Sequence, residues 1–403
     1  MDGARTRGQP VALQAVATMV RGPGPQAVLF IGPDGVGKTT LALDLAAGLL
    51  CTAALADRPC RDCRACRLVE HGSHPDLHRL GPVGPGRQVV IGGPEAKYRG
   101  VRDLISDLAL MPVEGGARVA IIESADRMNE DAQTALLKTL EEPPSGVTIV
   151  ICADRLARLL PTVRSRCAVI RLGLLGPRDI EGILDDHGLA DPPTAARLAR
   201  LAGGRPGIAL AYARKPEAVL IRAELTCLLL DFTDAGPAVR LTAARAAIPR
   251  AIMLATALAT DDQALARSSP RGRRRGGATA LAQVGSELEA GPDTGADGDA
   301  DDLVSTSVRT PATDRRRGVE VLLGLWSDVA RDLILVGAGG SRSIHDTVLI
   351  DELGATASGV DAADVVRFLG RIGRSAEALA ANVSPELILD ALVLAWPGRR
   401  AAA

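Results

Sequence analysis

A glycine-rich loop near the start of the chain has the residue types and spacing of a phosphate-binding site. It lies between a segment typical of a strand and a segment typical of a helix. Residues 28–31 are a short apolar run typical of a buried strand, and residues 40–50 are rich in alanine and leucine, as in a helix. The intervening loop fits G-x-x-x-x-G-K-[ST], in which glycines turn backbone amides toward a phosphate, lysine reaches the terminal phosphates and threonine can hold Mg²⁺. The spacing predicts an ATP or ADP site with Mg²⁺, formed by Gly32, Pro33, Gly35, Gly37, Lys38, Thr39 and Thr40.

Four cysteines follow this stretch within sixteen positions: Cys51, Cys60, Cys63 and Cys66. Four thiolates are a ligand set that tetrahedral zinc prefers, and cysteines in an intracellular chain favour metal binding over disulfides. With four protein ligands the ion has no open position, so we expect a structural zinc. His71 and His74 are alternative ligands, but we expect them to be surface or capping residues.

Composition limits the function classes. The chain has 403 residues, of which 47% are hydrophobic, 24% charged and 2% aromatic, with a formal net charge of −1. This length accommodates two or three domains, and the scarcity of aromatics argues against a base-stacking surface for single-stranded nucleic acid. No apolar run reaches the ~18 residues of a membrane span, and no signal-peptide pattern opens the chain, so we expect a cytoplasmic protein without a membrane partner.

The elements that must position the loop alternate between helices and strands. Apolar residues at helical spacing predict helices over 9–20, 101–110 and 131–142, and apolar runs predict strands over 28–31, 119–122, 147–152 and 168–172. This alternation predicts a parallel sheet covered on both faces. Glu123 directly follows the second predicted strand, where an acidic side chain can help to hold Mg²⁺ opposite the loop.

The second half of the chain lacks strand signals. A small helical segment, beginning with a helix over 177–186, is expected to end near 214, and alanine- and leucine-rich helices follow. We therefore expect three domains: 1–174 (with a zinc module at about 51–80), 175–214 and 215–403. Residues 268–312 are polar and glycine-rich, which predicts a largely disordered insert. Its arginines at 271–275 are a candidate DNA-phosphate contact, although a solvated linker is the favoured interpretation.

Several motifs together carry a family resemblance over most of the first 210 residues. LPTVRSRC at 160–167, ALLKTLEEPP at 135–144 and HPDL at 74–77, with the loop and the cysteines, resemble the clamp-loader ATPases of bacterial DNA polymerase III, which are AAA+ proteins. The resemblance implies an α/β P-loop AAA+ domain with a zinc insert, a small helical lid domain and an all-α collar domain. GGRPGIAL at 203–210 looks most like the lid helix of the delta-prime branch, and residues 382–387 resemble the end of the collar.

Three positions depart from the motor subunits of that family. Motor subunits end the second strand with Asp-Glu, where this chain has Glu123 and Ser124, and a serine hydroxyl is a poor base at neutral pH. Ala153–Asp154 stand where a neutral polar sensor is expected. Gly207 occupies the position of the lid arginine, for which Arg205 would have to substitute. Nucleotide binding with impaired hydrolysis is therefore expected.

Arg166, in Ser-Arg-Cys, matches the family's arginine finger, which serves a neighbouring subunit; the alternative is a structural arginine at the end of a strand. The resemblance implies a delta-prime-like subunit of a hetero-pentameric ring, with motor ATPase and delta-like subunits as partners, that loads the sliding clamp on primed DNA. One alternative is a motor (gamma/tau-like) ATPase hydrolysing ATP through Lys38, Thr39 and Glu123. A P-loop kinase or unrelated AAA+ chaperone would leave the cysteines, LEEPP and Ser-Arg-Cys unexplained together.

Overall fold

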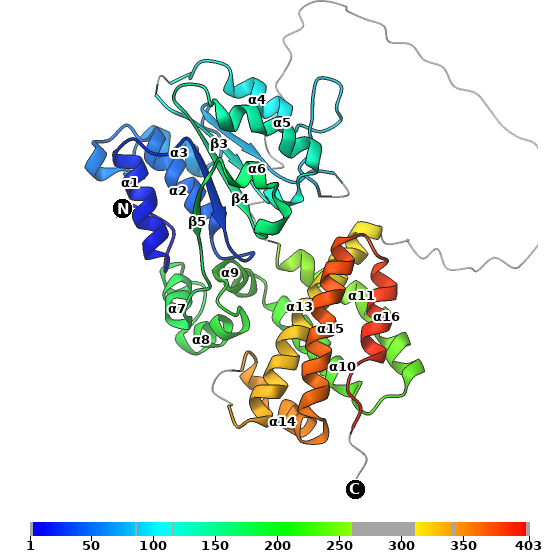
Figure 1. Cartoon of the computed structure of the whole chain (residues 1–403). Coiled ribbons are helices and arrows are strands. Elements are labelled where there is room, and N and C mark those ends of the chain that lie inside the picture. Colours follow the sequence, from blue (N-terminus) through cyan, green and yellow to red (C-terminus); the bar gives the residue numbers. More distant parts are fainter. Residues whose placement is uncertain (1–2, 85–86, 115, 260–310, 341–343, 400–403) are drawn as a thin grey trace, which may run out of the picture.

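The computed structural model describes residues 3–84, 87–114, 116–259, 311–340 and 344–399. The insert expected over 268–312, with its arginines at 271–275, therefore lies outside the described residues apart from its last two positions. Within the described ranges, a sheet-containing half is followed by an entirely helical half (Figure 1).

The sheet-containing half is built on five strands. They are β1 (Ala27–Ile31), β2 (Leu77–Leu80), β3 (Arg118–Ile122), β4 (Val147–Ala153) and β5 (Ala168–Arg171). All neighbours pair in parallel, in the order β2-β3-β4-β1-β5. Because side chains alternate along a strand, Val28 and Phe30 of β1 enter one core, whereas Leu29 and Ile31 enter the core on the opposite face.

Helices cover both faces, as the sequence pattern predicts. The face toward Val28 is packed by α1 (Pro10–Arg21), α2 (Lys38–Leu50) and α3 (Arg64–Glu70). The other face is packed by α4 (Val101–Leu108), α5 (Glu130–Glu141) and the short α6 (Pro161–Arg164). Single-turn 3₁₀ helices lie at Leu55–Asp57, Ala125–Arg127, Leu156–Arg158 and Thr347–Leu349.

Strand β2 was not predicted from the sequence. It lies at the edge of the sheet and pairs only with β3, and its middle residues are His78 and Arg79, which are half-buried. A four-residue strand with polar side chains on both faces carries little hydrophobic periodicity, so only its pairing identifies it.

The two histidines near the cysteines differ in their surroundings. His71 is an exposed residue that ends α3, as expected. His74 is only 4% exposed, and its Nδ1 accepts a hydrogen bond from the backbone N–H of Asp76 (3.1 Å). Of the two expected roles, surface or capping, His74 therefore has the capping one, in a buried turn.

Helices form the rest of the described chain. The first three are α7 (Pro177–Asp186), α8 (Pro192–Leu201) and α9 (Pro206–Arg214). The next six are α10 (Pro216–Asp231), α11 (Pro237–Ala257), α13 (Ala312–Gly337), α14 (Ile350–Gly359), α15 (Ala362–Ala380) and α16 (Pro385–Leu394). Six of the nine begin with proline, whose fixed φ and missing N–H suit a first helical turn. One continuous hydrophobic core extends from Leu175 to Trp396.

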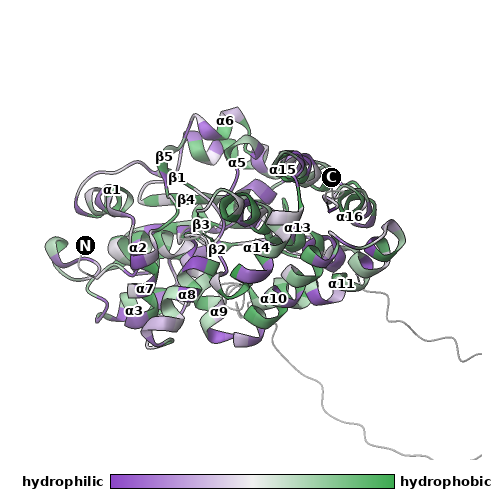
Figure 2. Ribbon diagram, turned by 90° about the horizontal axis from the view of Figure 1, so that it is seen from below, coloured by the Kyte–Doolittle hydropathy of each residue, from purple (hydrophilic) through white to green (hydrophobic). Residues whose placement is uncertain are grey.

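Apolar and polar residues are interspersed along these helices (Figure 2). Within the described ranges, no helix combines the length and the hydropathy that crossing a bilayer requires.

Candidate nucleotide and metal sites

The phosphate-type loop lies between the carboxyl end of β1 and the start of α2. Gly35 and Gly37 have φ values of 77° and 99°, in the left-handed region that glycine adopts without strain. A Cβ on Gly32 would lie 2.4 Å from the carbonyl oxygen of Leu172. The glycines at these positions are therefore required by the backbone path, as the motif predicts.

Lys38 is the most buried polar residue of this loop, with 8% of its surface exposed. Its Nζ donates to the carbonyl oxygens of Gly32 (2.9 Å) and Pro33 (2.8 Å) and forms an ion pair with Oδ1 of Asp154 (2.6 Å). The register of the sheet explains the contact between Lys38 and Asp154. Ile31, the last residue of β1, pairs with Ala153, the last residue of β4, so the segments that follow the two strands begin side by side. Burial raises the pKa of the Asp154 carboxyl, although the charge of Lys38 opposes that shift.

A cavity of about 560 Å³ opens from this loop. Its lining includes residues 34–40 of the loop, among them Thr39 and Thr40, together with Ser124 and Asp154. Residues of α9 close one side, where the N–H of Gly207 donates to the carbonyl oxygen of Gly35 (2.9 Å). The volume and lining suit a nucleoside phosphate held by loop amides and the α2 N-terminus.

Several residues that the sequence singles out do not line this cavity: Gly32, Pro33, Glu123 and Arg205. Glu123 forms an ion pair with Arg79, whose Nη2 lies 2.6 Å from the carboxylate. Its expected contact with Mg²⁺ remains a prediction. Arg205 donates to the carbonyl oxygen of Ala202 (3.1 Å) instead of entering the cavity.

Other lining residues were not identified from the sequence. Arg214 at the end of α9 and the following Lys215 line the cavity, and so do residues 4–7. These residues belong to no recognisable sequence motif. Only the tertiary structure brings them close to the phosphate-type loop.

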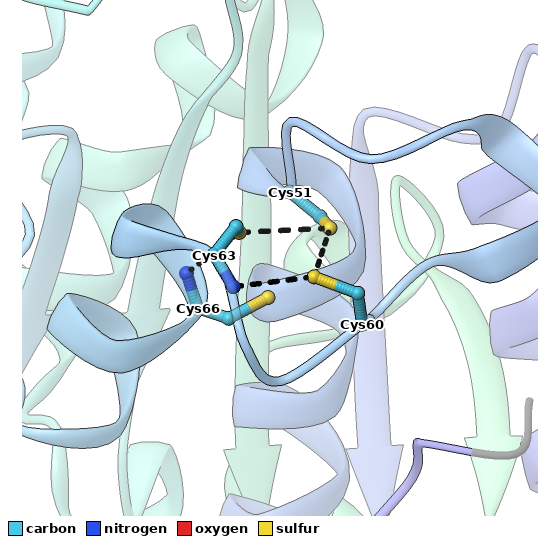
Figure 3. Close-up of side chains that lie close together, drawn as sticks. All are labelled: Cys51, Cys60, Cys63 and Cys66. Atoms are coloured by element: carbon cyan, nitrogen blue, oxygen red, sulfur yellow. Dashed lines mark hydrogen bonds between the residues drawn. The ribbon is translucent and has the colours of Figure 1, made fainter.

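The four cysteines converge as the spacing predicts (Figure 3). Their sulfur atoms all lie within 4.8 Å of one another, with 3.5 Å between Cys51 and Cys60 and 3.9 Å between Cys51 and Cys63. Tetrahedral Zn–S bonds of about 2.3 Å would place sulfurs about 3.8 Å apart, so these separations fit zinc. Cys51 directly follows α2, and Cys63 and Cys66 lie at the start of α3, so the cluster joins two helices.

The surroundings of the thiols shift their pKa values and direct backbone N–H groups at their sulfur atoms. Burial is the largest influence on Cys63 and opposes ionisation, but hydrogen bonds from Thr52 and Cys66 lower the pKa of Cys63 to about 6. Burial raises the pKa of Cys66. Backbone N–H groups of Cys63 and Cys66 also point at the preceding sulfurs, at 3.4 Å each. Such a donor set fits a closed, structural metal site.

Arg166 lies between α6 and β5 and is not part of the cavity lining. Its guanidinium donates to the carbonyl oxygen of Thr162 (2.8 Å) and forms an ion pair with Glu141 of the LEEPP segment. About a third of the side chain remains exposed. The geometry therefore keeps Arg166 away from the loop of its own chain.

Comparison with known proteins finds relatives for the sheet-containing half. Residues 9–175 match the family described as DNA polymerase III, delta subunit. DNA polymerase III subunit delta' of Pseudomonas aeruginosa is 36% identical over 183 residues, covering 45% of this chain and 53% of that protein. Subunit delta' of Escherichia coli is 34% identical over 200 residues, covering 49% and 57%. Subunit tau of Escherichia coli is 34% identical over 203 residues, covering 49% and 30%.

The chain thus spans about half the length of the curated delta' relatives it matches. The matched part contains the phosphate-type loop, the four cysteines and Arg166. The resemblance to the delta-prime subunits of the DNA polymerase III clamp loader, which the motifs predict, is therefore confirmed for this part of the chain.

Proposed function

We propose that this chain is a delta-prime-like subunit of a DNA polymerase III clamp loader that binds ATP or ADP but hydrolyses ATP weakly. One observation carries the proposal: Glu123 is engaged by Arg79, and Ser124 takes the place that faces the cavity. A serine hydroxyl neither coordinates Mg²⁺ as a carboxylate does nor orients attacking water as a base. Phosphate binding through Lys38 and Thr39 is unaffected by that exchange.

Arg166 is proposed as a finger that acts on a neighbouring subunit. Its separation from the cavity of its own chain and its partial exposure support this role, since a finger must reach a phosphate held by another protein. Glu141 would orient the guanidinium in the free subunit. The partners would be motor ATPase and delta-like subunits in a hetero-pentameric ring, with the sliding clamp and primed DNA as targets.

Domain roles follow from the same proposal. Residues 1–174 would form the AAA+ domain, 175–214 the lid and 215–403 the collar through which ring subunits associate. The contact of Gly207 with Gly35 supports a lid that closes on the loop. Cys51, Cys60, Cys63 and Cys66 would hold a Zn²⁺ whose contribution is to stabilise the fold.

A motor (gamma/tau-like) ATPase is the second candidate, favoured by the intact loop and by the match to subunit tau. The two functions differ in the rate at which the isolated subunit hydrolyses ATP.

Titration of the purified full chain with ADP and ATP should show binding, and Lys38→Ala should weaken it because the cation facing the terminal phosphates is lost. Steady-state ATP hydrolysis should be negligible. Brisk hydrolysis that Lys38→Ala abolishes would overturn the proposal in favour of the motor ATPase.

A further inference from the structure

The N-terminal strap, defined as residues 3–9, connects the cysteine module to the nucleotide cavity. Residues 4–7 of the strap line the cavity, and Ala4 and Thr6 are buried. The far end of the strap is fixed at the sheet, where Gln9 donates to the carbonyl oxygen of Gly173 (2.7 Å). Displacement of the strap would therefore change one wall of the cavity.

Asp44, on α2, is the residue that holds the strap. Its carboxylate accepts hydrogen bonds from the N–H groups of Arg5 (3.0 Å) and Thr6 (2.9 Å) and from the Thr6 hydroxyl (2.7 Å). Only 1% of Asp44 is exposed. A carboxylate buried this deeply is costly without a cationic partner, so its hold on the strap depends on a counter-charge.

Arg61 supplies that counter-charge from inside the cysteine module and, like Asp44, also lines the cavity. It lies between Cys60 and Cys63, forms an ion pair with Asp44, and donates through Nε to the carbonyl oxygen of Gly3 (2.6 Å). Its φ of 64° is in the left-handed region, which is unfavourable for an arginine and persists only where the surroundings enforce it. The turn between the two cysteines is what sets the direction of this side chain.

We propose that Arg61 is a positioning residue through which zinc binding at the four cysteines fixes the strap and so raises the affinity of the cavity for a nucleoside phosphate. This inference rests on the metal and nucleotide sites proposed above. Without the ion, the Cys60–Cys63 turn loses the constraint that keeps Arg61 on Asp44. The strap and the cavity wall that it forms are then released.

The experiment compares zinc-loaded and chelator-treated full-length protein, with zinc content measured in every sample. Hydrogen exchange at the Arg5 and Thr6 amides reports the strap directly, and titration with ADP reports the cavity. Zinc removal should accelerate exchange at both amides and weaken ADP binding about fivefold or more. Zinc-loaded Arg61→Ala should show the same changes, and removal of its zinc should add little, because the coupling is already lost.

Two further variants separate coupling from direct effects. A Cβ on Gly3 would lie 2.0 Å from the carbonyl oxygen of Pro59, and Gly3 does not line the cavity. Gly3→Val should therefore displace the strap and weaken ADP binding while zinc content is unchanged. Arg67→Ala, an exposed arginine on α3 of the same module, is the matched control and should behave as the unchanged protein.

Unaltered exchange at Arg5 and Thr6 after zinc removal, or in Arg61→Ala, would overturn the inference. So would equal and additive losses of ADP affinity from the variant and from zinc removal, since uncoupled sites behave in that way. Protein that holds no zinc as purified would overturn both the metal site and the coupling. A failure of ADP to bind even the zinc-loaded unchanged chain would count against the nucleotide site alone, because the exchange measurement decides the link to the strap.

Discussion

Lys38 already has three partners in this structure: two loop carbonyls and the carboxylate of Asp154. An arriving terminal phosphate must share or displace the carboxylate, and the two negative groups repel each other. A neutral polar residue in place of Asp154 would not repel the phosphate. If the cavity binds nucleotide as proposed, we expect Asp154 to disfavour the more highly charged nucleotide, ATP.

Replacement of Asp154 tests whether its carboxylate repels the terminal phosphate. Asp154→Asn keeps the size of the side chain but removes its charge, and it should tighten ATP binding by about threefold to tenfold, with a smaller gain for ADP. Calorimetric titration of both nucleotides measures the effect, and Lys38→Ala is the control that should weaken both. Equal or weaker ATP binding by Asp154→Asn would contradict a net repulsion between this carboxylate and ATP.

At this scale the sequence predicts the residues of the loop and of the cysteine cluster, because each set is defined by short-range spacing. It marks Asp154 as unusual but cannot show that its partner is Lys38, since that contact depends on the register of β1 with β4. The same limit applies to Asp44 and Arg61, which are ordinary charged residues until the fold buries them together.

The cysteine module is the element with the most direct test. Cys63 both contributes to the cluster and caps the N-terminus of α3. Cys63→Ser should lower zinc content below one half equivalent and accelerate proteolysis within about residues 51–80, because a metal cage contributes folding free energy. Nucleotide binding should persist at reduced affinity. Full zinc occupancy in this variant would contradict a four-thiolate site.

A partly buried pair of His345 and Asp332 in the helical half predicts that the free energy of unfolding depends on pH. His345 donates its backbone N–H to Asp332 of α13 (3.0 Å), and its Nδ1 lies 2.8 Å from the same carboxylate. The hydrogen bond with Asp332 raises the pKa of His345 above its usual 6.5. A raised pKa in the folded state means that the stabilisation is complete below about pH 6.5 and is lost as pH rises through the folded value.

The free energy of unfolding should therefore show a larger difference between the unchanged chain and His345→Gln at pH 6 than at pH 8.5. Chemical denaturation at the two pH values measures this difference. His187, which ends α7, is the control position, and His187→Gln should not reproduce the effect. A difference that grows toward pH 8.5 would contradict a stabilising protonated His345.

Among the elements, the long helices and the central strands were predictable because their hydrophobic periodicity is strong. The helix expected over 177–186 is α7 (Pro177–Asp186). Strand β2 was missed because His78 and Arg79 leave it without a clear apolar face. Whether such a polar segment becomes a strand depends on its pairing with β3, which the local sequence does not encode.

At the scale of the whole molecule, the phosphate-type loop and Arg166 lie in the same sheet-containing half, but Arg166 does not line the cavity that opens from the loop. The loop follows β1 and faces α9, whereas Arg166 precedes β5 and pairs with Glu141 at the end of α5. In the proposed function, the cavity would hold a nucleotide and Arg166 would offer a cation to a neighbour's nucleotide. The helical half, with its single core, would keep such neighbours in register.

ATP turnover by a reconstituted clamp-loader ring containing Arg166→Ala is the measurement that tests this account most directly. The variant should fold, bind ADP as the unchanged chain does and assemble into the ring, as sizing would show. Ring turnover and clamp loading should nevertheless fall, since an arginine finger is worth ~10³–10⁵ in rate at the site it serves. Arg155→Ala, an exposed arginine of the same half, should leave turnover unchanged. Full turnover in an assembled Arg166→Ala ring would contradict the account and reduce Arg166 to a structural residue.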